Sequence, residues 1–339
     1  MRRKYLTNRE IRAISKLLFG DQRCRPENRM GLLTPRCAQQ EAYTPTASYH
    51  FTPEETHEVV SGALDTLTNP ALETTRKKIQ EVLDRKVKIY FTINNRIKNL
   101  QKFKGRNFGI PFFFHSLIPS KSFTQTLKNL KFQIAEAREA YEKCVLNLRC
   151  QLNQEQENRW NALRGVFAQD EVVWDITADH EPTEAFGEYG RHVISNFTRC
   201  EISFGESELD VLKCETKALF LENANGANFF FYPNFVIMEQ NNSVAVLSPQ
   251  ELQISCARVN VLENHLPEGA FACDQVWVRA KKNGERDLRY KDNAAVPVAE
   301  YVRLNLDTAK GVHESYLFGR IPFGESFVQA LCLYCSNFK

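Results

Sequence analysis

Apolar residues recur in alternating steps of four and three along residues 79–100 and again along residues 123–148. The first series is Ile79, Leu83, Lys86, Tyr90, Ile93, Ile97 and Leu100, with Lys86 as its charged member. The second series is Phe123, Leu127, Leu130, Ile134, Ala137, Tyr141, Cys144 and Leu148. This repeat is typical of helices that pack along a narrow seam. Two seams joined by one connection predict a long antiparallel, coiled-coil-like helical hairpin; two ordinary helices of a bundle are the alternative.

Proline, glycine and capping residues predict where these helices begin and end. Thr52-Pro53-Glu54-Glu55 combines an N-cap, a first-turn proline and a capping-box glutamate, and Asn69-Pro70 has the same logic. Each predicts a helix start. Glycine and proline in the connection, residues 105–120, end the first helix of the hairpin. The same connection contains Phe112-Phe113-Phe114, which either packs against the rest of the protein or forms an exposed apolar tip.

Beyond residue 165 the pattern changes to short β-prone runs. Cys200–Phe204 alternates with period two, and Asn228–Met238 is rich in aromatic and β-branched residues. Asn241-Asn242 is one of several turn dipeptides between such runs. An apolar stretch near Glu325–Tyr334 predicts a terminal helix. The fold class is therefore α+β, with an N-terminal helical region and a C-terminal β-rich domain, either a sandwich or a partly open barrel.

These patterns divide the chain into three parts. Residues 1–50 are basic and interrupted by prolines, and we expect an irregular arm there. Residues 51–165 form the predicted helical hairpin domain. Residues 166–339 form the predicted β-rich domain, which we interpret as a recognition or regulatory domain.

Positive charge is concentrated in the first part of the chain. The whole chain has a net charge of +3, but residues 1–135 contain 24 basic and 11 acidic side chains, a balance of +13. Residues 136–339 contain 20 and 30, a balance of −10. Residues 85–135 contain eleven Lys or Arg and no Asp or Glu. A field of one sign attracts phosphate, lipid headgroups or an acidic partner.

The basic residues fall opposite the apolar seam on a helical wheel, so the first helix is expected to be apolar on one face and basic on the other. The candidate residues for binding nucleic acid or another partner are these bases and the phenylalanines of the connection: Arg85, Lys88, Arg96, Lys98, Lys102, Lys104, Arg106, Lys121, Lys128, Phe112, Phe113 and Phe114. Lysine and arginine would contact phosphates, and phenylalanine would stack on bases. The stretch Arg279–Lys291 is a second basic patch, whose alternative interpretation is a charged turn paired with nearby acids.

Motifs of the common enzyme classes are absent from the sequence. The weak catalytic alternative is Asp210 with Glu215 and Lys217, since an Asp and an E-x-K sequence on adjacent strands can hold a divalent metal for phosphodiester cleavage. His180, among Asp175, Asp179 and Glu181, is interpreted as part of a solvated acidic loop. The ten cysteines are scattered, and without a secretory signal we expect reduced thiols. No cofactor and no metal site are predicted.

The C-terminal segment resembles a β-rich domain of uncharacterised bacterial proteins. The matching residues span about 200–335 and are Tyr232-Pro233-Asn234-Phe235, Glu263, Leu266-Pro267-Glu268-Gly269-Ala270, Val276-Trp277, Asn283 to Tyr290, Asn293, Val296-Pro297-Val298 and Tyr301. The resemblance supplies no catalytic residue. It implies a bacterial, cytoplasmic protein with a recognition or regulatory module.

We therefore expect a non-enzymatic binding or adaptor subunit of a bacterial accessory system, such as a defence system. Its partner would be nucleic acid or an acidic protein, bound by the basic hairpin, and the chain could assemble into a homo- or hetero-oligomer. The alternatives are the metal-dependent nuclease and a protein that uses the basic face and the phenylalanines on an anionic membrane.

Overall fold

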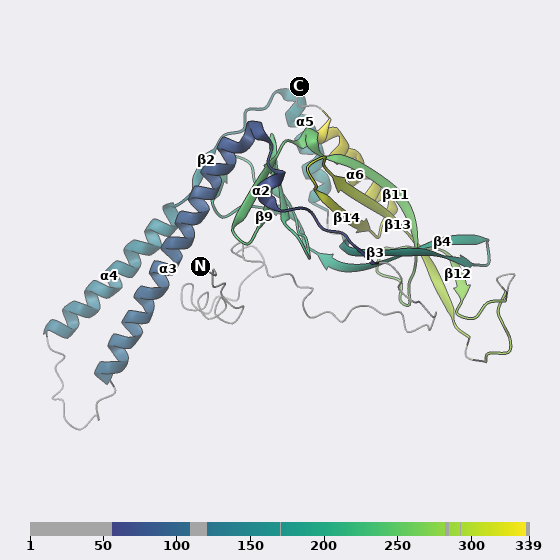
Figure 1. Cartoon of the computed structure of the whole chain (residues 1–339), viewed down its shortest axis with the longest axis horizontal. Helices are drawn as coiled ribbons and strands as arrows, with labels where there is room; N and C mark the ends of the chain where they lie inside the picture. Colours follow the sequence, from purple (N-terminus) through teal and green to yellow (C-terminus); the bar gives the residue numbers. More distant parts are fainter. Residues whose placement is uncertain (1–55, 109–120, 170, 282–284, 292, 337–339) are drawn as a thin grey trace. The chain divides into compact units, whose positions relative to one another are not determined.

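The computed structural model describes residues 56–108, 121–169, 171–281, 285–291 and 293–336 (Figure 1). The expected arm at residues 1–50 and the phenylalanines of the connection lie outside these residues. The described chain divides into two compact units. Lys77–Leu148 and Leu209–Lys213 belong to the first, here called the helical unit. The described residues of Pro35–Arg76, Arg149–Glu208 and Cys214–Lys339 belong to the second, here called the β-rich unit.

Two long helices and a small two-stranded sheet make up the helical unit. The elements are α3 (Glu73–Phe108), whose first four residues belong to the β-rich unit, α4 (Lys121–Lys143), β2 (Leu146–Leu148) and β6 (Leu212–Cys214), whose last residue belongs to the β-rich unit. The strands β2 and β6 pair. The predicted helix start at Asn69-Pro70 is confirmed, because Asn69 caps a short 3-10 turn, Pro70–Leu72, that leads into α3. Residues of the predicted seams are buried on both helices: Ile79, Leu83, Lys86, Ile93, Ile134 and Ala137. The second seam was predicted to continue to Cys144 and Leu148, but α4 ends at Lys143; Cys144 is buried just beyond it, and Leu148 lies in β2.

The predicted helix start at Thr52 is not followed by a helix, because Thr56–Glu58 forms the strand β1. This strand pairs with β3 in the β-rich unit, and a short helix, α2 (Leu64–Leu67), comes after it. Pairing with a sheet, which depends on residues far away in the sequence, has overridden the local capping signal.

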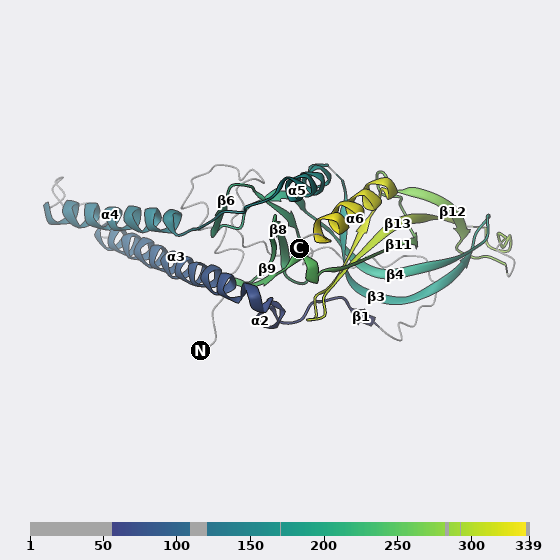
Figure 2. The ribbon, with the colours of Figure 1, turned by 90° about the horizontal axis from the view of Figure 1, so that it is seen from above.

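The larger sheet of the β-rich unit has seven strands in the order β1-β3-β14-β13-β11-β4, with β12 paired to β13 (Figure 2). Their bounds are β3 Val173–Phe186, β4 Arg191–Ile202, β11 Gln253–Leu262, β12 Phe271–Trp277, β13 Ala295–Asp307 and β14 His313–Phe318. An additional antiparallel pairing joins β3 to β4. The pairings therefore close a ring, in which β4 and β11 meet at a single parallel pair, Asn260 with Ile194.

The smaller sheet of this unit has five antiparallel strands in the order β10-β9-β8-β7-β5. Their bounds are β5 Phe204–Ser207, β7 Ala218–Leu221, β8 Asn228–Tyr232, β9 Phe235–Gln240 and β10 Ser243–Leu247. Asn241 and Asn242 form the predicted turn between β9 and β10, both with positive φ, as a two-residue hairpin turn requires. A 3-10 turn, Pro249–Glu251, follows β10.

Two helices, α5 (Gln154–Phe167) and α6 (Ile321–Cys335), pack against each other and help to form the main core of the β-rich unit. Phe167 of α5 and Phe327 of α6 have ring centroids 4.9 Å apart, and Phe318 of β14 lies at the same distance from Phe327. Such aromatic packing accounts for part of the high phenylalanine content. The α+β class, the β-rich C-terminal region and the terminal helix are thus confirmed.

Candidate functional site

The predicted basic face of α3 is exposed. The side chains of Arg85, Lys88, Lys98 and Lys102 are all exposed, while Ile79 and Ile93 on the seam are at most 2% exposed. None of these four bases makes an ion pair or side-chain hydrogen bond with another described residue. No described side chain neutralises their charge, which is therefore available to a partner.

An exposed aromatic ring shares this basic face. Phe91 is 45% exposed, and its ring lies 6.1 Å from that of Tyr90. Positions 88, 91, 98 and 102 differ by three, seven and four, so they follow one side of a helix with 3.6 residues per turn. Lys88, Lys98 and Lys102 thus flank an apolar ring that is not used in the core. Phe91 was not among the predicted binding residues, although the helical wheel that groups the lysines also groups this residue with them.

The helix α4 shows the same combination. Lys128 and Lys131 are exposed, and Phe132 is 70% exposed. Phe132 lies four residues after Lys128, so the two side chains are neighbours on one face. Neither lysine makes an ion pair with a described residue. Lys131 was not among the candidate residues, and Phe132 was likewise overlooked.

The remaining predicted binding residues are either engaged within the helical unit or have side chains outside the described part of the structure. Arg96 donates a hydrogen bond from Nη1 to the backbone oxygen of Gln133, so this guanidinium links α3 to α4. Lys104, Arg106 and Lys121 lie within the helices, but their side chains are outside the described part of the structure, as are Phe112, Phe113 and Phe114.

The buried charge within the first seam has a defined partner. Lys86 is 6% exposed, and its Nζ lies 2.7 Å from the backbone oxygen and 2.8 Å from Oδ2 of Asp210. The same ammonium lies 4.6 Å from the centre of the Tyr141 ring. Tyr141 donates to Oδ2 of Asp210 over 3.3 Å, and burial together with this carboxylate raises the pKa of the phenol well above its usual value. The lysine is therefore a structural member of the seam and no part of the exposed basic face.

A surface groove lies between the two helices, with a volume of about 530 Å³. Its apolar part is formed by Ile97, Leu100, Ile134 and Ala135. Its charged rim combines both signs: Lys131, Arg138, Glu139 and Glu142.

The residues of the nuclease alternative are engaged in different ways. The carboxylate of Asp210 is occupied by Lys86 and Tyr141. Glu215 lies 3.9 Å from Nε of Arg149 on the surface, and Lys217 is exposed. Within the described ranges, no group of three or more His, Cys, Asp or Glu side chains is arranged to hold a metal ion.

The second basic patch pairs largely with its own neighbours. Asp287 binds Arg289, and this arginine lowers the pKa of the carboxyl to about 2. The guanidinium of Arg279 lies 4.0 Å from the centre of the Tyr290 ring. Asn293 accepts from the backbone N–H of residue 279 and donates to its oxygen. This arrangement corresponds to the charged turn that was the alternative interpretation.

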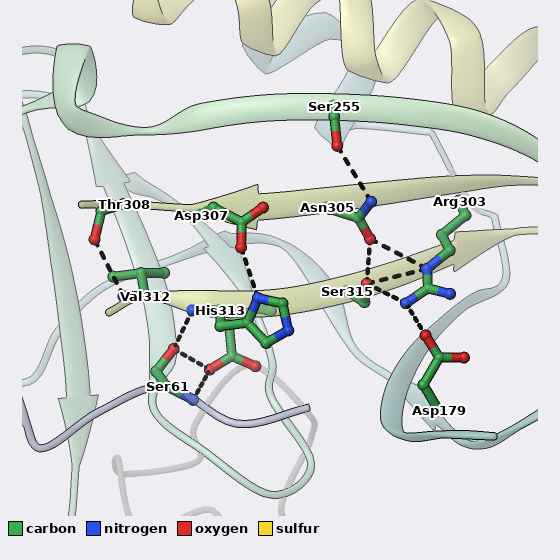
Figure 3. A network of polar contacts seen from close by, with 11 residues as sticks. Ser61, Asp179, Ser255, Arg303, Asn305, Asp307, Thr308, Val312, His313 and Ser315 are labelled. Carbon is green, nitrogen blue, oxygen red and sulfur yellow. Dashed lines mark hydrogen bonds and ion pairs between the residues drawn. The ribbon is translucent and has the colours of Figure 1, made fainter. Parts of the chain in front are cut away.

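Polar side chains on β13 and β14 form a network on the surface of the β-rich unit (Figure 3). Arg303 binds Asp179 over 2.7 Å and also donates to Asn305 and Ser315. His313 contacts Asp307 through Nδ1 at 2.6 Å. Arg303, His313 and Asp179 border a groove of about 410 Å³. The hydrogen bonds of this network join side chains of β13 and β14 to one another.

Two carboxyl groups lie deeply buried beneath this surface. Asp175 is 0% exposed on β3 and accepts a hydrogen bond from the backbone of Ala224 at 2.8 Å. Burial raises its pKa to about 8. Glu314 accepts from Ser61, and burial raises its pKa to about 7. The interpretation of Asp175 as part of a solvated loop is therefore wrong. Strand pairing between distant residues buries these two acids, so no local pattern in the sequence indicates that they are buried.

The described helices include none that is long and apolar enough to cross a membrane. Comparison of the chain with protein-family models, with curated proteins and with solved structures finds no match.

Proposed function

We propose that α3 and α4 form an antiparallel helical hairpin whose exposed basic faces bind nucleic acid. Three contacts support the antiparallel arrangement. Val82 accepts from Cys144, Lys86 lies over Tyr141, and Arg96 donates to Gln133. The residue number rises along α3 as it falls along α4, as expected of two helices that run in opposite directions.

The observation that carries the proposed binding is a set of six exposed basic residues between residues 85 and 131 that have no ion-pair partner among the described residues: Arg85, Lys88, Lys98, Lys102, Lys128 and Lys131. Residues 77–148 contain fifteen Lys or Arg and five Asp or Glu, a balance of +10. A surface of this kind gathers phosphates and gives an affinity that falls steeply with salt.

The exposed rings favour nucleic acid over an acidic protein. Phe91 and Phe132 each lie beside a lysine of their own helix. A surface on which aromatic rings alternate with basic side chains suits single-stranded nucleic acid. Its unpaired nucleobases stack on the rings, and the lysines contact the phosphate backbone.

The β-rich unit would carry this hairpin as a recognition or adaptor module. Its ring of strands, nearly open between β4 and β11, supports the partly open barrel that the sequence suggested as one possibility. The bacterial, cytoplasmic setting and membership of an accessory system belong to the same proposal and rest on the sequence resemblance.

The test is the binding of labelled single-stranded and duplex DNA and RNA by fluorescence anisotropy. The variant Lys98→Glu/Lys102→Glu is compared with Lys217→Glu/Lys291→Glu, which makes the same change in net charge at two exposed lysines of the β-rich unit. We expect the first pair to abolish binding and the control pair to leave it nearly unchanged. Equal losses of affinity in the two variants would show that only the net charge of the protein matters. If the unaltered protein binds no nucleic acid, the proposal is wrong and an acidic protein becomes the expected partner.

A further inference from the structure

Cys150 and Cys214 lie next to each other, with their Sγ atoms 3.6 Å apart. Both are free thiols and both are half-buried. They are separated by 64 positions in the sequence, so the fold brings them together and no local motif announces the pair. The sequence analysis counted them only among scattered cysteines.

The backbone around the two thiols is held by a sheet. Cys214 is the last residue of β6, and Cys150 follows the end of β2 by two residues. These strands pair, and the backbone N–H of Leu146 donates to the oxygen of Val211 at 2.8 Å. A disulfide has a length of about 2.05 Å, so the two sulfur atoms need to approach by roughly 1.5 Å. Rotation of the cysteine side chains can supply such a movement without breaking the sheet.

We propose that Cys150 and Cys214 form a reversible disulfide, exchanged with low-molecular-weight disulfides. In the first step the thiolate of Cys214 attacks one sulfur of the small disulfide, forms a mixed disulfide and releases one small thiolate. In the second step Cys150 gives up its proton, which the released thiolate takes, and its sulfur attacks Cys214. The second small thiolate leaves and takes the proton that Cys214 lost. Two protein thiols are oxidised and one small disulfide is reduced to two thiols.

The surroundings assign the order of attack. Burial, followed by the neighbouring Cys214, raises the pKa of Cys150 to about 12, so this thiol stays protonated at neutral pH. A protonated thiol does not attack a disulfide, so Cys150 does not react with the small disulfide directly. It resolves the mixed disulfide after it has passed its proton to the released thiolate, because the sulfur of Cys214 is then already in contact. Cys214 also lies 4.0 Å from the hydroxyl of Thr216.

The disulfide would form where the chain passes between the two units. The chain passes between the two units after Leu148 and again after Lys213, one or two residues before each cysteine. A bond between Cys150 and Cys214 would tie these two crossing segments to each other. It would also close a long loop, which restricts the unfolded chain and raises the unfolding temperature by roughly 5–15 °C.

The experiment equilibrates the full chain in buffers with a graded ratio of oxidised to reduced glutathione, followed by acid quenching, digestion and peptide mass spectrometry. We expect a linked peptide pair that contains Cys150 and Cys214 and grows with the oxidised fraction. Cys200 is already disulfide-bonded, so the readout is the identity of the linked peptides and not the total number of thiols. This bond also shows that the expectation of reduced thiols is wrong for Cys200.

The matched variants are Cys150→Ser, and Cys256→Ser as a control at an exposed free thiol. The increase in unfolding temperature on oxidation should persist in Cys256→Ser and disappear in Cys150→Ser. Should Cys150→Ser fail to fold, native alkylation of the unaltered protein replaces it: Cys214 should be labelled faster than Cys150, and prior oxidation should protect both. Absence of the linked peptides at every glutathione ratio, or linkage of Cys150 to several cysteines equally, would overturn the proposal.

Discussion

The salt dependence of nucleic-acid binding follows from the number of exposed bases on the helical unit. The perturbation is Lys98→Gln/Lys102→Gln, which removes two positive charges from the exposed face of α3 while keeping two long polar side chains. Neither lysine has an ion-pair partner among the described residues, so the change leaves no described carboxylate unpaired. Stability should therefore change little.

The expected magnitude comes from counterion release. Six exposed basic residues are described between residues 85 and 131 of the two helices: Arg85, Lys88, Lys98, Lys102, Lys128 and Lys131. If each contacts one phosphate of a duplex, the logarithm of the binding constant falls with the logarithm of salt concentration with a slope of about −5.4. Between 50 and 200 mM salt this slope is a loss of about 1,800-fold. Four contacts in the double variant give a slope of about −3.6 and a loss of about 150-fold.

The assay is a salt titration of anisotropy with one labelled duplex, run on the unaltered protein, the double variant and Lys217→Gln/Lys291→Gln as the control. We expect the slope to become less steep by about 2 in the first variant and to stay unchanged in the control. A double variant whose slope equals that of the unaltered protein would show that Lys98 and Lys102 do not contact phosphate. A slope near zero for the unaltered protein would refute the electrostatic reasoning as a whole.

Three further predictions concern the rings, the buried lysine and the buried acids. Phe91→Ala and Phe132→Ala should each weaken single-strand binding by about 1–3 kcal/mol, with little change on duplex, and equal losses on both would contradict stacking. Lys86→Ala should lower the free energy of unfolding by about 1–3 kcal/mol, because Asp210 loses a charged partner. Lys86→Met should recover part of this loss, because methionine completes the apolar seam. Chemical denaturation measures both changes. Asp175 has a folded-state pKa of about 8, far above that of an unfolded aspartate, so the folded state retains a proton that the unfolded state loses. Stability should therefore fall as pH rises from about 4 to 8, and Asp175→Asn should flatten this fall in thermal unfolding measured across pH; an unchanged pH profile would place the ionisation elsewhere.

The sequence predicted those elements whose conformation depends on neighbouring residues, such as helices and tight turns. The step of four and three along residues 79–100 predicted a helix and its buried side, and Asn241-Asn242 predicted a hairpin turn. The helix α3 itself is longer than this series and runs from Glu73 to Phe108. Lys86 interrupted the seam in the sequence without indicating how its charge would be satisfied. Its partner Asp210 lies 124 positions away, and no periodicity reveals such a contact.

The errors and omissions have the same origin. The capping residues at Thr52 suggested a helix, but pairing with β3 makes Thr56–Glu58 a strand. Asp175 stood among acidic neighbours in the sequence, yet β3 pairs with β14 and β4, and these pairings bury it. The thiols of Cys150 and Cys214 meet because β2 pairs with β6. Contacts across a sheet depend on the topology of the whole chain, which single-sequence patterns do not encode.

The most direct test of the central claim is to map where nucleic acid touches the protein. A photoreactive single-stranded oligonucleotide is crosslinked to the unaltered chain, and the modified peptides are identified by mass spectrometry. Binding through the helical unit predicts crosslinks on the peptides of α3 and α4 that contain Phe91 and Phe132, removed by Lys98→Glu/Lys102→Glu. Crosslinks confined to the β-rich unit, or unaffected by that variant, would contradict it.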